Sequence, residues 1–237
     1  MLAVFVNCGT VILGSVIGLL FAKKFTEELS DMIQTACGII TMVLGMQMAF
    51  KYDNIVYLAL SLILGAIVGY ALDIDGAILN LGKKLEKLTK KDSSGANPNS
   101  NFAYAFLNSS VLFCVGAMSI VGSFEAGVNH NYTTIFTKSI LDGFMAISFT
   151  AAMGIGTVFS IISIFVYQGA LTLLSSFLQP YVSNLLIQEL SACGGAIIIM
   201  IGINLLGLKK IKTANFLPAL LFEILFVICV PLIKNLF

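Results

Sequence analysis

The stretch TACGIITMVLGMQ, residues 35–47, returns near the other end of the chain as SACGGAIIIMIGIN, residues 191–204. Both copies open on small residues and continue as an apolar run. Such runs decide the fold, because 58% of the 237 residues are hydrophobic and only 11% are charged, whereas a soluble domain carries about 25% charged residues. With a mean hydropathy of +0.99, the sequence predicts an all-α, polytopic membrane protein.

The number of membrane spans follows from the length of the apolar runs. A spanning helix needs about 20 apolar residues, and fewer where it is broken. The sequence predicts eight spans, with seven as the alternative because only Gly154–Gly156 separates the fifth from the sixth. The expected spans are 3–22, 35–50, 54–72, 103–122, 139–153, 157–178, 191–208 and 215–235.

Three pairs of similar segments recur in the same order along the chain. GTVILGS (9–15) matches GTVFSIIS (156–163), TACG (35–38) matches SACG (191–194), and KYDNIVYLAL (51–60) matches KTANFLPALL (212–221). Spans one to three would then correspond to spans six to eight. Five spans separate each pair, so the two copies would point in opposite directions, as in transporters with inverted repeats.

We therefore expect a single integral membrane domain, 1–237, with internal organisation. Its expected parts are a first repeat (1–74), a cytoplasmic amphipathic helix and loop (75–101), two central spans (102–153) and a second, inverted repeat (154–237).

Lysine placement predicts the orientation, because lysine is enriched in cytoplasmic loops. If the Lys-rich segment 83–91 is cytoplasmic, ten lysines lie inside and only Lys51, Lys138 and Lys234 lie outside. This favours eight spans with both termini outside. The segment DGAILNLGKKLEKLTKK (75–91) has Ile78, Leu81, Leu85 and Leu88 at helical spacing, which is typical of a helix lying on the inner leaflet.

The quoted stretches are candidate binding elements. Spans two and seven are short, and Thr35 and Ser191 have the side chains of N-cap residues. Short, Gly-interrupted segments in corresponding positions of two halves point to a transporter site, and free N–H groups at helix starts attract anions. The expected residues here are Thr35, Cys37, Gly38, Ser191, Cys193, Gly194 and Gly195.

Polar side chains inside the apolar runs are further candidates. Glu223, one turn after Pro218, is expected to bind the coupling proton or cation, because a charge inside a bilayer costs about 2.5–3.5 kcal/mol. Asp142 is expected near a helix start with Lys138 as its partner, and Glu189 is expected to cap the start of span seven or to gate an outer opening. Asn7, Thr10, Gln47, Gln168 and Asn204 are expected to line a path or to join helices.

Several classes of chemistry have no support in the sequence. The single histidine, His130, lies in an expected outer loop, and no paired ligand spacing for a metal or a cofactor is found. All 13 basic residues are lysine, and no soluble basic domain exists to bind nucleic acid. We expect no catalytic residues, no metal and no cofactor, although an intramembrane enzyme is not excluded.

Four segments resemble a known family: FCVGAMSIVGSFEAG (113–127), KSILDGFMAISFTAAMGIGT (138–157), YQGALTLL (167–174) and ELSACGGAIIIMIGINLLG (189–207). Together they are similar to the bacterial membrane family called domain of unknown function 554. The resemblance covers most of the chain and implies a multi-pass protein of the bacterial cytoplasmic membrane. It assigns no functional residue.

The residues favour a secondary transporter of a small anionic or zwitterionic solute, coupled to H⁺ or Na⁺ and working by alternating access. The alternatives are a non-transporting scaffold, sensor or accessory subunit, and a channel. The expected partners are the lipid bilayer, the solute and the ion, and Gly-rich span faces would permit a homodimer.

Overall fold

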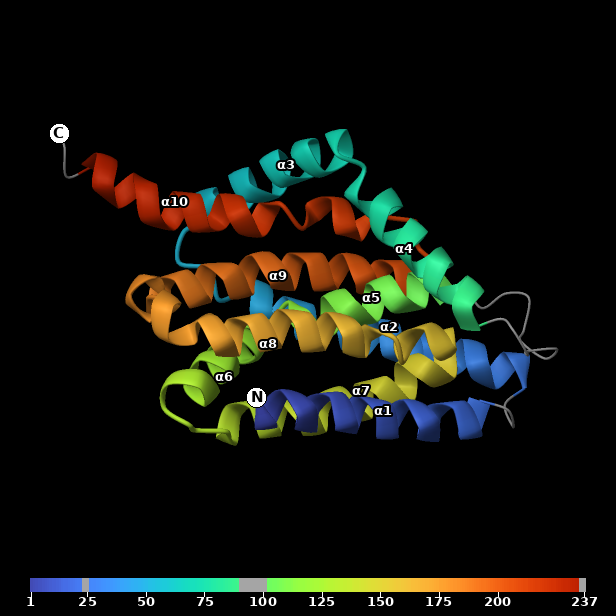
Figure 1. Ribbon diagram of the computed structural model, residues 1–237. Helices are drawn as coiled ribbons and strands as arrows, with labels where there is room; N and C mark the ends of the chain where they lie inside the picture. Colours follow the sequence, from blue (N-terminus) through green and yellow to red (C-terminus); the bar gives the residue numbers. More distant parts are fainter. Residues whose placement is uncertain (23–25, 90–101, 235–237) are drawn as a thin grey trace.

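The computed structural model describes residues 1–22, 26–89 and 102–234, and these fold into helices (Figure 1). The α-helices are α1 (Leu2–Ala22), α2 (Glu27–Ala49), α3 (Ile55–Ala71), α4 (Ile74–Thr89), α5 (Phe102–Cys114), α6 (Ala117–Val128), α7 (Thr133–Met153), α8 (Ser160–Leu178), α9 (Asn184–Leu205) and α10 (Ala219–Lys234). The short 3₁₀ helices are η2 (Ile155–Thr157), η3 (Gln179–Tyr181) and η4 (Thr213–Phe216).

The helices confirm a polytopic helical membrane protein. Within the described residues, five helices are long and apolar enough to cross a bilayer, and up to seven spans result if each of two bent helix pairs is one span. The eighth expected span corresponds to the shorter apolar segment Thr213–Cys229, which includes the first part of α10.

The predicted starts of spans two and seven are wrong. Helix α2 begins at Glu27, where the Thr26 hydroxyl accepts the N–H of Leu29 at 3.3 Å. Helix α9 begins at Asn184, where the Ser183 hydroxyl accepts the N–H of Leu186 at 3.1 Å. The true caps lie in the semi-polar segments before the apolar runs, so Thr35 and Ser191 are inside helices whose N–H groups are already used.

The boundary between spans five and six is confirmed. Helix α7 ends at Met153, and Gly154 follows with a φ of 89°, which a residue with a side chain rarely adopts. The fourth expected span, 103–122, is in contrast broken. Helices α5 and α6 meet at an angle of 58° with Gly116 in extended conformation between them, a break that the uninterrupted apolar pattern did not indicate.

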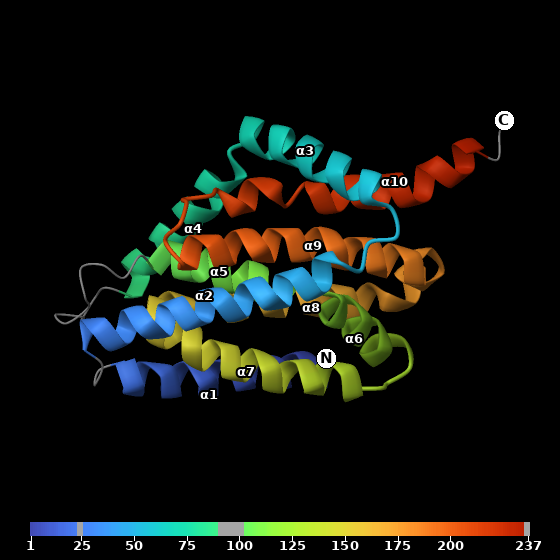
Figure 2. The ribbon, with the colours of Figure 1, turned by 180° about the vertical axis from the view of Figure 1, so that it is seen from behind.

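The helices expected to correspond in the two halves lie side by side and antiparallel (Figures 1 and 2). In the α2–α9 pair, a Cβ at Gly45 would lie 2.9 Å from the Gly195 carbonyl oxygen, and a Cβ at Gly202 would lie 2.9 Å from the Gly38 carbonyl oxygen. Residues later in α2 contact residues earlier in α9, so the two helices are antiparallel. Because glycine has no side chain, the two backbones can lie in contact.

The other two pairs have the same reversed order. In α3 and α10, Gly65 lies against Ala219 and Gly69 lies against Asn215. In α1 and α8, the Phe5 and Phe165 rings are 5.8 Å apart, and the Cys8 thiol lies 3.8 Å from the Ile161 carbonyl oxygen.

Helix α9 lies at the centre of the molecule, between α10 and α3 on one side and α2, α5 and α8 on the other (Figures 1 and 2). Its buried face joins one apolar core with residues of α2, α5 and α7. The members of this core are Cys37, Leu107, Val111, Val115, Phe149, Ile197, Ile201, Leu205 and Ala214.

Helix α4 forms where the amphipathic helix was predicted, bent by 57° from α3. It packs on the start of α5 through Gly82 and Ala103. Buried Asp75 accepts the Ala214 N–H at 3.2 Å and donates its own N–H to Asn215 at 2.8 Å, which ties α4 to η4. Leu81, expected on the apolar face, is 51% exposed.

Some expectations fall outside the described residues. These are the polar loop 92–101, Lys23, Lys24, Lys90 and Lys91, and the side chains of Leu85 and Leu88.

Candidate functional site

A first cluster of buried polar side chains joins four helices. The Asn7 amide of α1 donates to the Asp142 carboxylate of α7 at 3.1 Å and to the Gln168 side-chain oxygen of α8 at 3.0 Å. The Gln168 amide lies 3.4 Å from the Ser119 hydroxyl of α6. We call Asn7, Ser119, Lys138, Asp142 and Gln168 the amide–ion cluster.

The charges of this cluster come from one helix. Lys138 and Asp142 form the predicted ion pair, four residues apart on α7, and are 6% and 7% exposed. Two parts of the prediction are wrong. Because α7 already begins at Thr133, Asp142 is well inside the helix rather than near its start, and Lys138 lies in the helix rather than in an outer loop.

Ser119 connects the cluster to the broken span. Its hydroxyl donates to the Phe113 carbonyl at 2.9 Å, across the break between α5 and α6. Sequence reasoning did not select Ser119, although Gly116 three residues earlier was a signal for a break. Thr10, which was expected to line a path, instead donates to the Asn7 backbone carbonyl at 2.9 Å within α1.

A second cluster lies where α3, α9 and α10 meet. Glu189 of α9 and Glu223 of α10 are both 0% exposed. The Glu223 carboxyl faces the Glu189 carboxyl and the Ser61 hydroxyl of α3. Neither oxygen of Glu223 has a hydrogen-bond partner of ordinary geometry among the described residues. We call Glu189, Glu223 and Ser61 the acid-pair cluster.

Glu189 acts as a cap, but for another helix. Its Oε1 accepts the backbone N–H groups of Asp53, at 3.2 Å, and Asn54, at 2.7 Å, immediately before α3. The expectation that Glu189 caps the start of span seven is therefore wrong, because Ser183 caps α9 and Glu189 accepts N–H groups before α3.

The small residues of α9 that were predicted as binding residues are buried in contacts between helices. Cys193 is fully buried with Leu58, Ala192 and Ala219, one turn after Glu189. Ser191 is 1% exposed, and its hydroxyl has no partner among the described residues. Gly194 lies against Val115, and Gly195 lies against α2.

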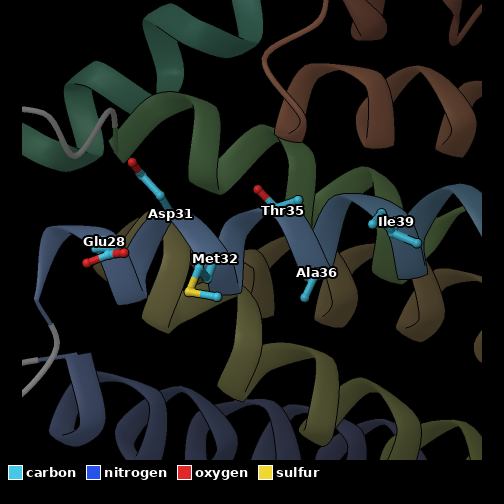
Figure 3. Close-up of a pocket in the computed structure, with 6 residues that line it drawn as sticks. All are labelled: Glu28, Asp31, Met32, Thr35, Ala36 and Ile39. Atoms are coloured by element: carbon cyan, nitrogen blue, oxygen red, sulfur yellow. The ribbon is translucent and has the colours of Figure 1, made fainter.

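The predicted residues of α2 do not converge on the same point. Cys37 is in the apolar core, and Gly38 packs against Leu206 of α9. Thr35 is exposed and lines an open depression along the outer face of α2, together with the labelled residues of Figure 3 (Glu28, Asp31, Met32, Ala36 and Ile39). The helix starts expected to face a shared site are thus not assembled into one.

Gln47 and Asn204, both expected to line a path or to join helices, have different environments. Gln47 is exposed on α2. The Asn204 side chain exchanges two hydrogen bonds with the backbone of Ile211, at 2.8 and 2.7 Å, and holds the connection between α9 and η4.

The side chains of the two clusters are ammonium, carboxyl, amide and hydroxyl groups, which can bind charged groups and protons. Across residues 1–22, 26–89 and 102–234, no group of three or more His, Cys, Asp or Glu side chains is placed to hold a metal ion. His130 is exposed in the α6–α7 connection.

Residues 2–228 match the family described as protein of unknown function (DUF554). The chain belongs to this family. It is 32% identical over 215 residues to "Uncharacterized membrane protein YdfK" of Bacillus subtilis (strain 168), which covers 91% of this chain and 90% of that protein. It is 25% identical over 217 residues to "Uncharacterized protein YqgA" of Escherichia coli (strain K12), covering 92% of each. No solved structure matches the chain.

The DUF554 match confirms the resemblance found in the sequence, and the name of the Bacillus relative agrees with the apolar helices. Three of the four resembling segments contribute to the amide–ion cluster: Ser119 lies in the first, Lys138 and Asp142 in the second, and Gln168 in the third. The fourth contains Glu189 of the acid-pair cluster.

Proposed function

We propose that this DUF554 protein is a secondary transporter that moves a small anionic or zwitterionic solute by alternating access, coupled to H⁺ or Na⁺. The amide–ion cluster is the observation that carries this proposal. It combines one ammonium, one carboxylate and two amides from α1, α7 and α8, all removed from solvent.

The composition of the cluster favours a zwitterion. Ionisable residues within membrane helices are costly and mark substrate or ion paths. A solute with a carboxylate and an ammonium group has the same two charges as the Lys138–Asp142 pair. It would bind by exchanging partners, its carboxylate to Lys138 and its ammonium to Asp142, without leaving a charge unpaired.

The arrangement of the helices supports alternating access. We interpret the antiparallel pairs α1–α8, α2–α9 and α3–α10 as an inverted repeat, the architecture in which one half rocks against the other around a fixed site. The α5–α6 break beside the cluster supplies irregular backbone inside the protein, which is typical of binding sites in transporters.

The test is uptake into proteoliposomes from a panel of small amino acids, carboxylic acids and amines. We expect uptake of a zwitterionic solute by the unmodified protein. Gln168→Met keeps the volume but removes the side-chain oxygen that accepts the Asn7 amide. It should reduce uptake at least tenfold, because the Asn7 amide that bonds Asp142 is left with an unsatisfied N–H, which costs about 1–3 kcal/mol.

Gln47→Met is the matched control, because Gln47 is exposed on α2, and it should transport normally. No uptake of any solute in the panel would favour a scaffold or accessory subunit. Passive, unsaturable flux would favour a channel, and equal uptake by both variants would place the solute elsewhere.

A further inference from the structure

The two carboxyl groups of the acid-pair cluster have different surroundings. Glu189 Oε1 accepts two backbone N–H groups at the start of α3, from Asp53 and Asn54. Such donors stabilise the ionised form of a carboxyl, and the positive end of the α3 dipole acts in the same direction. Glu189 Oε1 is therefore fixed as a hydrogen-bond acceptor at the start of α3.

Glu223 has the opposite surroundings. It is 0% exposed, and neither of its oxygens accepts a hydrogen bond from the described residues. It faces the Glu189 carboxyl and the hydroxyl of Ser61, which is itself 0% exposed and without a partner of ordinary geometry. A second carboxylate here would be both unsolvated and repelled by the first.

Helices α3 and α9, which pack against Glu223, contain no lysine. Helix α3 contributes Ser61, and its Tyr57 ring stacks on Phe226 at 5.9 Å. Helix α9 contributes Glu189 and the neutral thiol of Cys193. The ion pairs formed by the described residues are Lys138–Asp142 and Lys212–Asp73, and neither contains Glu189 or Glu223.

We propose that Glu189 and Glu223 form a proton-binding site that holds one exchangeable proton. Glu223 carries the proton and donates it to Glu189 Oε2, which has no partner among the described residues. Two adjacent buried carboxyls share one proton because they cannot both ionise. Ser61 is the second acceptor for the same proton.

Loss of the proton has a structural consequence. The released proton goes to water, and the pair then has two negative charges. Repulsion would move Glu189 away from Glu223 and from the N–H groups of Asp53 and Asn54, which would loosen the start of α3. The role of this pair as the coupling site of a transporter rests on the proposed function. The binding of one proton by the pair does not depend on transport.

The experiment is difference infrared spectroscopy of the purified protein in lipid, in H₂O and D₂O. We expect the unmodified protein to show the C=O band of a protonated carboxylic acid at neutral pH, with a downward shift in D₂O. Glu223→Gln, which keeps a neutral group of the same size, should lose this band. Glu28→Gln, at an exposed position of α2, should retain it.

Glu189→Gln is the second variant. It removes the neighbour whose negative charge disfavours ionisation of Glu223, so the band should remain at low pH but should disappear at a lower pH than in the unmodified protein. A band that survives Glu223→Gln, or its absence from the folded unmodified protein at neutral pH, would overturn the proposal. Loss of the band on adding NaCl but not choline chloride would also overturn it, by assigning the site to sodium. A protein that keeps the band but transports no solute would retain the proton site and lose the transport function.

Discussion

Lys138 and Asp142 form a buried ion pair within α7. Its spacing of four residues is visible in the sequence, and the pair was predicted from that spacing. The contact of Asn7 with Asp142, 135 residues apart, and with Gln168, 161 residues apart, depends on the packing of α1 against α7 and α8. The spacing of residues within one helix does not predict contacts between different helices.

Removing one charge of this pair should destabilise the protein. Asp142→Ala leaves the Lys138 ammonium buried and unpaired, and breaking a buried pair in this way costs about 3–5 kcal/mol. We expect a clearly lower thermal unfolding midpoint for the protein in detergent, measured by a thermal aggregation assay.

The double variant Lys138→Met with Asp142→Leu is the control. Because it removes both charges and retains apolar volume, its stability should return close to that of the unmodified protein. A double variant as unstable as Asp142→Ala would show that the charges are not the source of the loss.

Helix ends and helix contacts belong to the next scale. The apolar runs located most helices but not the break between α5 and α6, and the turn at Gly154 was predicted from paired glycines. The starts of spans two and seven were predicted too far along the chain. Helices α2 and α9 are capped by Thr26 and Ser183 and include the semi-polar segments before the apolar runs. Gly38 and Gly195 were assigned to helix starts, whereas in the structure they allow, with Gly45 and Gly202, close packing of α2 on α9.

A methyl group at Gly195 should separate these two helices. The Cβ of Gly195→Ala would lie 2.6 Å from the Gly45 carbonyl oxygen, and backbone cannot yield as a side chain does. We expect a loss of about 1–3 kcal/mol, measured as a lower unfolding midpoint. Gly9→Ala, with no atom within 4 Å of its Cβ, should be neutral or slightly stabilising. Equal midpoints for the two variants would contradict close α2–α9 packing.

At the scale of the whole molecule, α1 begins and α10 ends toward the same end of the bundle, and α4 lies toward the opposite end (Figures 1 and 2). The α6–α7 connection lies at the end away from α4. If α4 with its lysines is cytoplasmic, the α6–α7 connection and both termini are outside.

This orientation predicts opposite labelling of two exposed positions. In a background without the five cysteines, His130→Cys should react with a membrane-impermeant maleimide in intact cells. Lys83→Cys, on α4, should react only after the membrane is permeabilised. Reaction of both variants in intact cells would exclude the orientation.

The sequence by itself determined that this chain is an all-helical membrane protein of the DUF554 family, because apolar runs of spanning length have few other stable structures in a bilayer. It also predicted an inverted repeat and the Lys138–Asp142 pair. The pair is found, because the spacing of two residues on one helix is a local property, and the repeat stays a prediction. Only the tertiary structure decided which buried polar groups meet. Glu189 lies beside Glu223, and Asn7 beside Asp142 and Gln168, because helices distant in the chain pack closely through small residues.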